Sequence, residues 1–378
     1  MKKLLALVLA AMMLFGVLAA CSAKTATSSA SASAAPAVSA SASASATAPA
    51  ASASASASAG SGSASSSSDR AGCEQKAAVV KTTVRLGGLK GPTSIGMVGL
   101  LSQAEQGQTA NDYTFQMAGT ADELTPLLLK GDLDILAAPI NLASVLYNKS
   151  QGGVELLAIN TLGVLYIVEK GGETVTDWQS LKGQTIYATG KGATPEYTLR
   201  YLLQQNGLDP DKDVTIEFKS EPTEIVSQMA AEDHVIAMLP QPYVVVAQGQ
   251  VDGLRVALDL TAEWDKLNNG SRLLTAGLIV RKDFLDQNPD AVKNFLQEYA
   301  ASVDYVNSDV DGASQLVEKY DIVKAAVAKA AIPYCNIVCI TGDEMKSDAQ
   351  GYLQILFDQN PKAVGGTLPA DDFYVPAQ

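Results

Sequence analysis

The sequence predicts an α/β protein with two similar lobes and a helical C-terminal region, and three observations support this fold class. First, β-prone runs alternate with amphipathic helical runs through the middle of the chain, which is typical of sheets covered by helices. Second, the segment Val84–Leu101 is repeated at Thr185–Leu202, an offset of 101 residues. Third, the residues after Asp283 have helical periodicity. We therefore expect two α/β halves with a cleft between them.

The repeat continues beyond its first element without a gap. Each copy has the order strand, glycine turn, helix, strand, helix, strand, proline turn, helix. Lys191-Gly192 therefore follows Lys90-Gly91, and Pro240 follows Pro139, at the same offset. Because strands that alternate with helices usually lie parallel to their neighbours, we expect largely parallel sheets.

Residues 1–20 have the features of a signal peptide. Two lysines precede the apolar run Leu4–Phe15, and Leu18-Ala19-Ala20 stands immediately before Cys21. The alternative is a membrane-spanning helix, but Leu4–Ala20 is at the lower length limit for crossing a bilayer of roughly 30 Å. Leu-Ala-Ala-Cys resembles the lipobox of bacterial lipoproteins. We therefore expect acyl chains, palmitate among them, on Cys21, and a protein held on the outer face of the bacterial cytoplasmic membrane.

The segment that follows, residues 21–81, is expected to be a disordered tether after the lipidated cysteine. Ser22–Ser68 consists almost entirely of Ser, Ala, Thr and Pro, which bury too little apolar surface to offset the entropy of ordering. A flexible tether of this length would span on the order of 40 Å. The sequence leaves its glycosylation open.

Charge and histidine content exclude several classes of function. The formal net charge is −13, whereas a nucleic-acid surface needs clustered Lys and Arg. The only histidine, His234, lies in an expected solvated turn, which disfavours metal sites and histidine-dependent catalysis. We expect no metal, no cofactor and no catalytic residue. Cys73, Cys335 and Cys339 are expected as buried thiols, with a disulfide as the alternative.

The first lobe is assigned to residues 82–165 and 276–378. Glycines and Pro92 separate its first strand from a helix, and Thr120 with Glu123 has the spacing of a capping box. We expect strands at Val84–Leu86, Tyr113–Met117, Asp134–Ala138 and Val154–Ile159, and helices after Pro92, over Leu124–Leu129 and over Leu142–Tyr147.

The second lobe, assigned to residues 166–275, repeats this plan. We expect strands at Thr185–Ala188, Val214–Phe218 and Val235–Leu239, and helices over Glu196–Gln205, over Thr223–Ala231 and after Pro242. The runs Thr161–Leu165 and Thr275–Val280 resemble each other and are expected to be strands that carry the chain between the lobes. An apolar stripe predicts one helix over Asp283–Asn307 against the first lobe, and Leu353–Phe357 marks a last helix that ends near Gly365-Gly366.

Six turns stand where strands lead into helices, the position at which open α/β sheets bind ligands. They are Lys90–Ser94, Gly119–Asp122 and Pro139–Asn141 in the first lobe, and Gly192–Thr194, Ser220–Thr223 and Pro240–Pro242 in the second. Free N–H groups at helix starts suit an oxyanion. The glycines could instead serve only as tight turns, and Lys90 and Lys191 could be surface charges. Neither LGGLKGP nor GKGATP has the spacing of a nucleotide-binding loop.

Further motifs extend over about Thr82–Phe373: GDLDILAAPINLASVLYN, SLKGQTIYATGKGATPEYTLRYLLQQNGL, HVIAMLPQPYVVVAQ and LIVRKDFLDQNPDAVKNFL. With the lipobox, they resemble the substrate-binding lipoproteins of ABC importers of the nitrate/sulfonate/taurine type, which are related to binders of thiamine-pyrimidine precursors. The resemblance implies a two-lobed type II periplasmic-binding-protein fold, or Venus flytrap, and a monomer with an ABC permease and ATPase as partners. Together with the turns, it predicts ligand contacts at Lys90, Gly91, Pro92, Thr93, Ser94, Thr120, Pro139, Asn141, Gly192, Ala193, Thr194, Glu221, Pro240 and Gln241.

We therefore expect a non-catalytic receptor that delivers a small polar or anionic molecule to the permease, of the nitrate, sulfonate, bicarbonate or pyrimidine-precursor class. One alternative is an enzyme of thiamine-pyrimidine synthesis, whose relatives rely on a histidine and on cysteine-rich equipment that this chain lacks. Another is a surface sensor or adhesin. The six turns contain no arginine, so an amino acid is a less favoured ligand.

Overall fold

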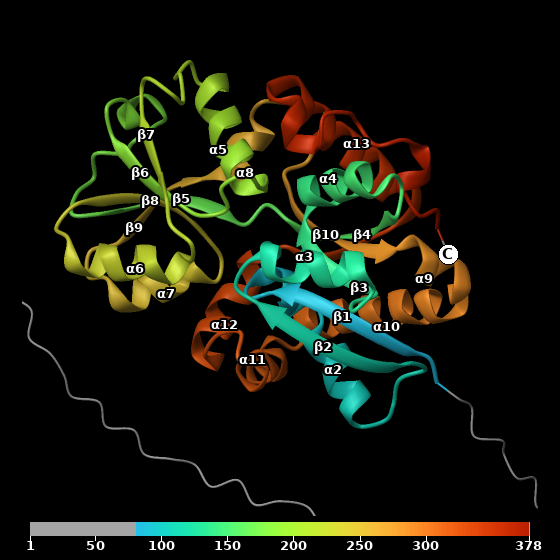
Figure 1. The fold of residues 1–378 in the computed structure, drawn as a ribbon. Helices are drawn as coiled ribbons and strands as arrows, with labels where there is room; N and C mark the ends of the chain where they lie inside the picture. The colour runs from blue at the N-terminus through green and yellow to red at the C-terminus, as the bar shows by residue number, and fades with distance from the viewer. Residues whose placement is uncertain (1–80, 378) are drawn as a thin grey trace, which may run out of the picture. The chain divides into compact units, whose positions relative to one another are not determined.

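The computed structural model describes residues 81–377 (Figure 1). The predictions for the signal peptide, for Cys21 and Cys73 and for the tether concern residues outside this range. No helix within residues 81–377 combines the length and the apolar character needed to cross a membrane.

Two β-sheets organise the described part of the chain. Sheet A has the strand order β11-β4-β10-β3-β1-β2, and sheet B has the order β7-β6-β8-β5-β9. We use lobe I for sheet A with its helices and lobe II for sheet B with its helices. The strands are β1 (Thr83–Leu89), β2 (Asp112–Ala118), β3 (Ile135–Pro139), β4 (Val154–Leu162), β5 (Leu165–Lys170), β6 (Thr185–Ala188), β7 (Thr215–Phe218), β8 (Val235–Pro240), β9 (Arg255–Asp259), β10 (Leu274–Arg281) and β11 (Ile337–Ile340).

Helices cover both sheets, as the alternating pattern predicts, and the longest of them belong to the C-terminal region. They are α1 (Pro92–Ile95), α2 (Val98–Glu105), α3 (Ala121–Lys130), α4 (Ile140–Ser150), α5 (Thr194–Gln205), α6 (Pro222–Ala231), α7 (Tyr243–Gln250), α8 (Leu260–Asp265), α9 (Lys282–Gln287), α10 (Pro289–Ser308), α11 (Val310–Lys319), α12 (Ala325–Ala331) and α13 (Gly342–Gln359). In lobe II, α6 and α7 cover one face of sheet B, and α5 and α8 lie on the other (Figure 1).

The predicted repeat is confirmed in both position and topology. Helix α3 and helix α6 are separated by 101 residues at both ends. The order β4-β10-β3-β1-β2 in sheet A corresponds, strand for strand, to β9-β5-β8-β6-β7 in sheet B. The fifth strand of each half lies in the other half's sheet, because β5 pairs within sheet B and β10 within sheet A.

This exchange corrects the expectation of largely parallel sheets. β1 pairs in parallel with β2 and β3, and β6 with β7 and β8, but β10 is antiparallel to both β3 and β4. β5 is likewise antiparallel to β8 and β9. The reason is connectivity: β5 and β10 enter their sheets from the other lobe, without the helical crossover that makes neighbouring strands parallel. The second crossing is residues 266–273, before β10, and not Thr275–Val280 as predicted.

The glycine-rich stretch that begins the repeat also differs from its prediction. Gly87 and Gly88 lie inside β1 and not in a turn. A Cβ atom on Gly88 would lie 2.4 Å from the Oγ atom of Ser94, and one on Gly87 would lie 2.6 Å from Leu133. These glycines permit close packing onto β1, and the positive φ occurs only at Gly91.

Three predicted helices differ from the structure by more than a few residues at their ends. The helix after Pro92 is interrupted between α1 and α2, and the helix over 283–307 is two helices, α9 and α10. Pro289 lacks an N–H group and keeps the residue before it out of the helical region. Helix α13 ends at Gln359, and Gly365 follows a separate 3-10 turn. Cys339 lies in β11, and within the described residues Cys335 and Cys339 are free thiols.

Three apolar cores hold these layers together. One lies between sheet A and helices α2, α10, α11 and α12. A second lies between sheet B and helices α6 and α7. The third extends from the α3–α4–α13 side of sheet A to the α5–α8 side of sheet B, and includes the fully buried side chains of Trp264 and Tyr352. Lobes I and II therefore share one continuous core.

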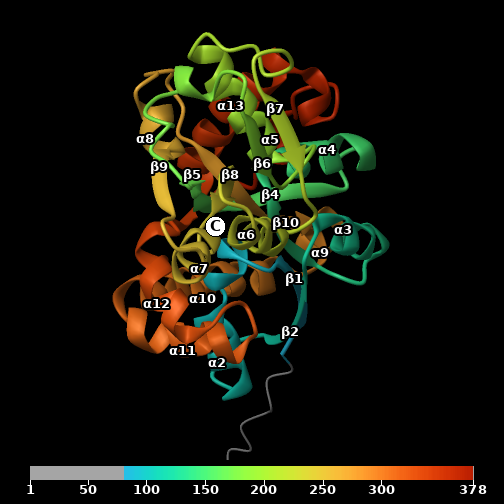
Figure 2. The same cartoon turned by 90° about the vertical axis from the view of Figure 1, so that its left-hand side faces the viewer.

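The lobes also contact each other at a second place. Helix α12 of lobe I packs against α7 of lobe II (Figure 2). On the shared-core side, the hydroxyl groups of Thr198 in α5 and Tyr352 in α13 are 3.0 Å apart.

Candidate functional site

A pocket of about 520 Å³ lies between the two sheets and is lined by 26 residues from both lobes. Each of the six turns that the sequence predicts at one cleft contributes at least one of these residues. This follows from the repeat, because the turns end parallel strands at equivalent edges of the two sheets.

The structure brings eight of the predicted contact residues to this pocket. They are Lys90, Pro92, Thr93, Thr120, Pro139, Gly192, Ala193 and Pro240. The other six do not line it: Gly91, Ser94, Asn141, Thr194, Glu221 and Gln241.

Two of the predicted hydroxyl groups are engaged by the protein itself. The Thr93 and Ser94 hydroxyls donate to the carbonyl oxygen of Leu89, at 3.1 Å and 2.6 Å. Both side chains are buried, and they fasten the first turn of α1 to the end of β1. Their positions therefore have a structural explanation that requires no ligand.

Asn141 and Thr194 contact each other across the two lobes. The Thr194 hydroxyl donates to Oδ1 of Asn141 at 3.2 Å. The Nδ2 atom of Asn141 donates to the carbonyl oxygens of Gly192 (3.2 Å) and Ala363 (3.1 Å). Both side chains are almost fully buried. Asn141 thus joins the start of α4 to the start of α5 and to the C-terminal region, beside the pocket wall.

Glu221 and Gln241 lie close to the pocket but outside its lining. Glu221 is the N-cap residue of α6, and a Cβ atom on Gly119 of lobe I would lie 2.7 Å from its Oε1 atom. The Glu221 carboxylate therefore reaches lobe I at Gly119. The buried Gln241 side chain has an Oε1 atom without a hydrogen-bond partner within the described residues.

Two of the helix starts use carboxylates of their own. The capping box predicted at α3 is present, because Oε1 of Glu123 accepts from the backbone N–H of Thr120 at 3.1 Å. At α5, Oε2 of Glu196 accepts from the N–H of Gly192 at 2.7 Å. These carboxylates occupy donors that an oxyanion would need, so helix starts alone are a weaker basis for anion binding than the sequence suggests.

Positive charge at the pocket comes from three lysines, whereas Asp122 is the acidic residue that lines it. Lys90 is 3.6 Å from Asp321. Lys219 is 3.9 Å from Glu217, and its ammonium lies 5.1 Å from the centre of the Tyr187 ring. Lys191 makes no ion pair with any residue in the range 81–377. Of the three lysines, Lys191 is therefore the one whose positive charge has no acidic partner within residues 81–377.

Sequence reasoning missed most of the apolar lining. The residues concerned are Leu89, Leu142, Val164, Leu165, Pro195, Phe218, Tyr243 and Ala276, together with the polar Thr189, Lys219 and Thr275. Burial, and then the negative charge of Glu221, raises the pKa of Tyr243 to about 12, so its hydroxyl stays protonated. Phe218 and Lys219 directly precede a predicted turn. Val164 and Thr275 lie within the two runs that the sequence predicts to cross between the lobes, so position relative to these features was the available signal.

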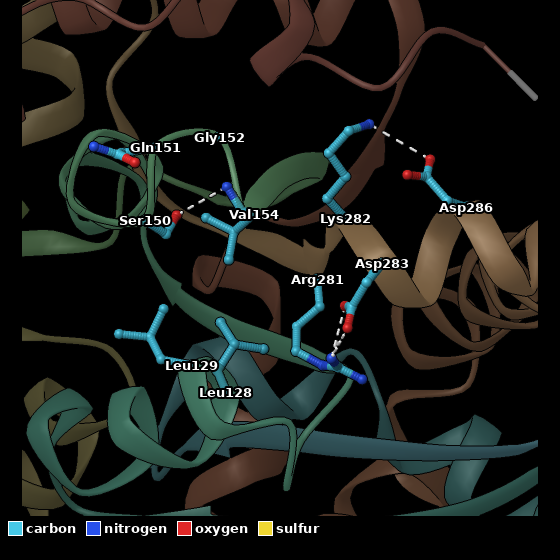
Figure 3. A pocket seen from close by; sticks show the side chains of 11 residues that line it. Leu128, Leu129, Ser150, Gln151, Gly152, Val154, Arg281, Lys282, Asp283 and Asp286 are labelled. Atoms are coloured by element: carbon cyan, nitrogen blue, oxygen red, sulfur yellow. Dashed lines mark hydrogen bonds and ion pairs between the residues drawn. The ribbon is translucent and has the colours of Figure 1, made fainter.

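A second depression, of about 550 Å³, lies beside β10 and α9 and is lined by lobe I alone (Figure 3). Its charged groups are paired with each other. Arg281 contacts Asp283 at 2.6 Å, and Lys282 contacts Asp286 at 3.4 Å. With its cations neutralised and one lobe forming every wall, this depression lacks the features that favour the inter-lobe pocket.

Neither metal nor histidine chemistry is indicated in the part of the chain that the structure describes. No three His, Cys, Asp or Glu side chains gather closely enough within it to hold a metal ion. His234 is exposed in a turn before β8, as predicted, and does not line the pocket.

Comparison with known proteins gives one family and a set of related structures. The family described as the NMT1-like family matches residues 114–319, more than half of the chain. No curated protein sequence matches.

Three solved structures resemble the chain throughout their length. An ABC transporter protein from Parabacteroides distasonis has 24% identity, with a TM-score of 0.66, and the match covers 79% of this chain and 100% of that one. The ligand-binding component of an ABC-type import system from Staphylococcus aureus, with zinc bound, has 17% identity and a TM-score of 0.62, covering 78% and 97%. The periplasmic aliphatic sulphonate-binding protein SsuA from Escherichia coli has 15% identity and a TM-score of 0.62, covering 79% and 94%. These likenesses establish the periplasmic-binding-protein fold.

Proposed function

This chain belongs to the NMT1-like family, and we propose that it is an extracytoplasmic solute receptor of an ABC importer, with its ligand in the inter-lobe pocket. The observation that supports the proposal most strongly is that one pocket is lined by all six turns of the duplicated lobes. The solved structures of this fold named above include the ligand-binding component of an import system and a sulphonate-binding protein.

A receptor of this kind works by closure. Two segments connect the lobes, Gly163-Val164 and residues 266–273, and a ligand that contacts both lobes stabilises the form in which they approach each other. The first segment is held by Asn336, which donates to the carbonyl oxygen of Gly163 at 2.5 Å and accepts from the N–H of Leu162 at 3.1 Å. Rotation about such anchored segments would open and close the pocket without changing either sheet.

The ligand class that we propose is a small polar or anionic molecule, of the nitrate, sulfonate, bicarbonate or pyrimidine-precursor type. Three lysines against one aspartate support an anion. The pocket side chains offer no histidine or cysteine for acid–base or nucleophilic chemistry, which favours binding over catalysis.

The partners that we propose are an ABC permease and its ATPase, met by a monomeric receptor. Cys21 is the proposed attachment site of the lipid anchor on the outer face of the membrane. Cys21→Ser should release the protein from the membrane fraction, because acyl chains supply about 0.8 kcal/mol per buried CH₂ and hold the chain durably only in combination. Retention of the variant on membranes would contradict lipidation.

The receptor role is tested by identifying what the protein carries. Native mass spectrometry after gentle purification should detect one small molecule per chain. Titration of the stripped protein with that molecule should then restore stoichiometric binding with the molecule recovered unchanged. Chemical conversion of the molecule would favour the enzyme alternative, and a protein that carries and binds no small molecule would favour the sensor or adhesin.

A further inference from the structure

The second segment that connects the lobes, residues 266–273, contains one of the two Asn-Gly pairs of the sequence. This pair is Asn269-Gly270, and the other is Asn206-Gly207 at the end of α5. An asparagine before glycine is open to reaction with its own backbone, because glycine has no side chain that hinders its nitrogen. Exposure does not distinguish the two pairs, since in each the asparagine is half-buried and the glycine is exposed. Their hydrogen bonds do distinguish them.

The Asn206-Gly207 pair is held by its neighbours. The N–H of Gly207 donates to the carbonyl oxygen of Gln204 at 3.0 Å. The Nδ2 atom of Asn206 donates to the carbonyl oxygen of Leu202 at 2.8 Å, and the carbonyl oxygen of Asn206 accepts from Gln179. The nitrogen that would attack and the amide that would be attacked are therefore both engaged, and a reaction must first break these bonds.

At Asn269 the same groups are arranged for reaction. The N–H of Gly270 has no acceptor within residues 81–377. The Oδ1 atom of Asn269 accepts from the N–H of Ser271 at 3.0 Å, which closes an Asx turn whose ring includes the nitrogen of Gly270. The same N–H would stabilise the negative charge that forms on Oδ1 when its carbon is attacked. The Nδ2 atom, which would leave, has a 3.3 Å contact with the Tyr201 hydroxyl.

We propose that Asn269 is a site of self-modification, at which the asparagine is converted to aspartate and isoaspartate. The nitrogen of Gly270 forms a bond to Cγ of Asn269. The Cγ–Nδ2 bond breaks, and ammonia leaves with the proton of the Gly270 N–H, so that a cyclic succinimide remains. Water then opens the ring at one or the other of its carbonyl groups, which gives aspartate or isoaspartate. Water is the co-reactant, and no group is oxidised or reduced.

The two products change the crossing in different ways. Both add a negative charge to a surface depression of about 270 Å³, which Asp265 and Asp348 also line. Aspartate keeps the oxygen that accepts from Ser271, whereas isoaspartate carries the main chain through its Cβ and Cγ atoms and so lengthens the crossing by one atom. Trp264 of α8 donates to the carbonyl oxygen of Ser271 at 2.8 Å, and Arg272 pairs with Asp348 of α13. Because the crossing is anchored in this way to both lobes, the added atom should destabilise the protein.

Peptide mapping of the full chain tests the proposal. The folded protein is aged in water enriched in a heavy oxygen isotope and digested at acidic pH, and aspartate and isoaspartate in each peptide are measured by mass spectrometry. We expect the isotope at position 269, and conversion of Asn206 slower by roughly tenfold or more because its hydrogen bonds must open first. In urea the two pairs should react at similar rates, since their hydrogen bonds are lost. Asn269→Gln should remove the product at this position.

The effect on the crossing is measured on separated forms. Anion exchange isolates the converted protein through its added charge, and the isoaspartyl form should melt at a lower temperature than both the unconverted protein and the Asn269→Asp variant. An isoaspartyl form as stable as the unconverted protein would overturn the effect proposed for the added atom. In the folded protein, conversion of Asn206 as fast as that of Asn269, or no conversion of Asn269, would overturn the assignment of the site. None of these measurements depends on the receptor function.

Discussion

The contact between Asn141 and Thr194 gives the sharpest test of how the two lobes are joined beside the pocket. Asn141→Ala removes three hydrogen bonds and leaves a buried hydroxyl and two carbonyl oxygens without their partner. Net hydrogen-bond contributions of about 1 kcal/mol each predict a loss of about 3 kcal/mol in the free energy of unfolding. Thr194→Val keeps the shape of the side chain and removes one of these bonds, so it should cost about 1 kcal/mol.

The double variant isolates the contact itself. If the Thr194 hydroxyl bonds Asn141, then Asn141→Ala costs less once that hydroxyl is gone, and the two changes should couple by about 1 kcal/mol. The assay is equilibrium unfolding in urea, followed by tryptophan fluorescence and by circular dichroism. Trp264 is a suitable reporter because it is fully buried in the core that both lobes share. Coincident transitions by the two probes would justify a single free energy.

A control variant measures the change in stability when a threonine hydroxyl that bonds only within one lobe is removed. The Thr125 hydroxyl donates to the carbonyl of Ala121 within α3, and such a bond contributes little to helix stability, so Thr125→Val should be close to neutral. A coupling below about 0.3 kcal/mol between the Asn141 and Thr194 changes would refute the inter-lobe bond, since that value is typical of independent sites.

Two further predictions concern the core of lobe I. Asp134 is fully buried; burial opposes its ionisation, but hydrogen bonds from Arg85 and Arg281 outweigh it and hold the pKa of Asp134 below its usual range. Asp134→Asn should therefore cost about 3 kcal/mol near neutral pH. The stabilisation that this carboxylate gives is present above its unfolded pKa of about 3.9 and is lost as pH falls through the lower folded value. Below about pH 4, the free energy of unfolding of the variant should therefore fall less steeply than that of the parent. Urea titrations at several pH values measure this, and an equal fall in both proteins would contradict it. Gly88→Ala should destabilise by about 1–3 kcal/mol, because the added Cβ would lie 2.4 Å from a neighbouring oxygen, whereas Gly249→Ala in α7 meets no atom within 4 Å and should stabilise by up to about 1 kcal/mol. Thermal unfolding of both glycine variants compares them directly. Similar changes in melting temperature would mean that close packing against β1 does not determine the cost of an added methyl group.

Much of the fold could be predicted because the same order of strands, turns and helices occurs twice in the sequence. Local signals locate single elements, but the offset of 101 residues also shows that two sets of strands occupy equivalent positions. Helices α3 and α6 lie at this offset at both ends, and the capping box before α3 is present as predicted. The sequence did not show that β5 and β10 exchange sheets, because strand direction depends on connections between lobes and not on residue patterns.

The sequence predicts the location of the pocket more accurately than the individual residues that line it. Turns at the ends of parallel strands identify the place. Which side chain faces the ligand depends on partners distant in sequence: the Thr194 hydroxyl is taken by Asn141, 53 residues earlier, and Ser94 bonds the strand before it. Apolar lining residues such as Val164 have the same appearance in a sequence as core residues, so a polar-residue search passes over them.

The place of β10 in sheet A determines the order in which the lobes can be completed during synthesis. Sheet B consists of strands between Leu165 and Asp259, so all its members are available once that stretch has emerged. Sheet A cannot be completed until β10 has been synthesised, because β10 lies between β3 and β4 in the sheet and follows both by more than a hundred residues in the chain. Until then the two facing edges have unpaired N–H and C=O groups, which invite wrong pairing. The lobe whose strands emerge first is therefore the last to be finished, and the nascent chain is most open to aggregation in that interval.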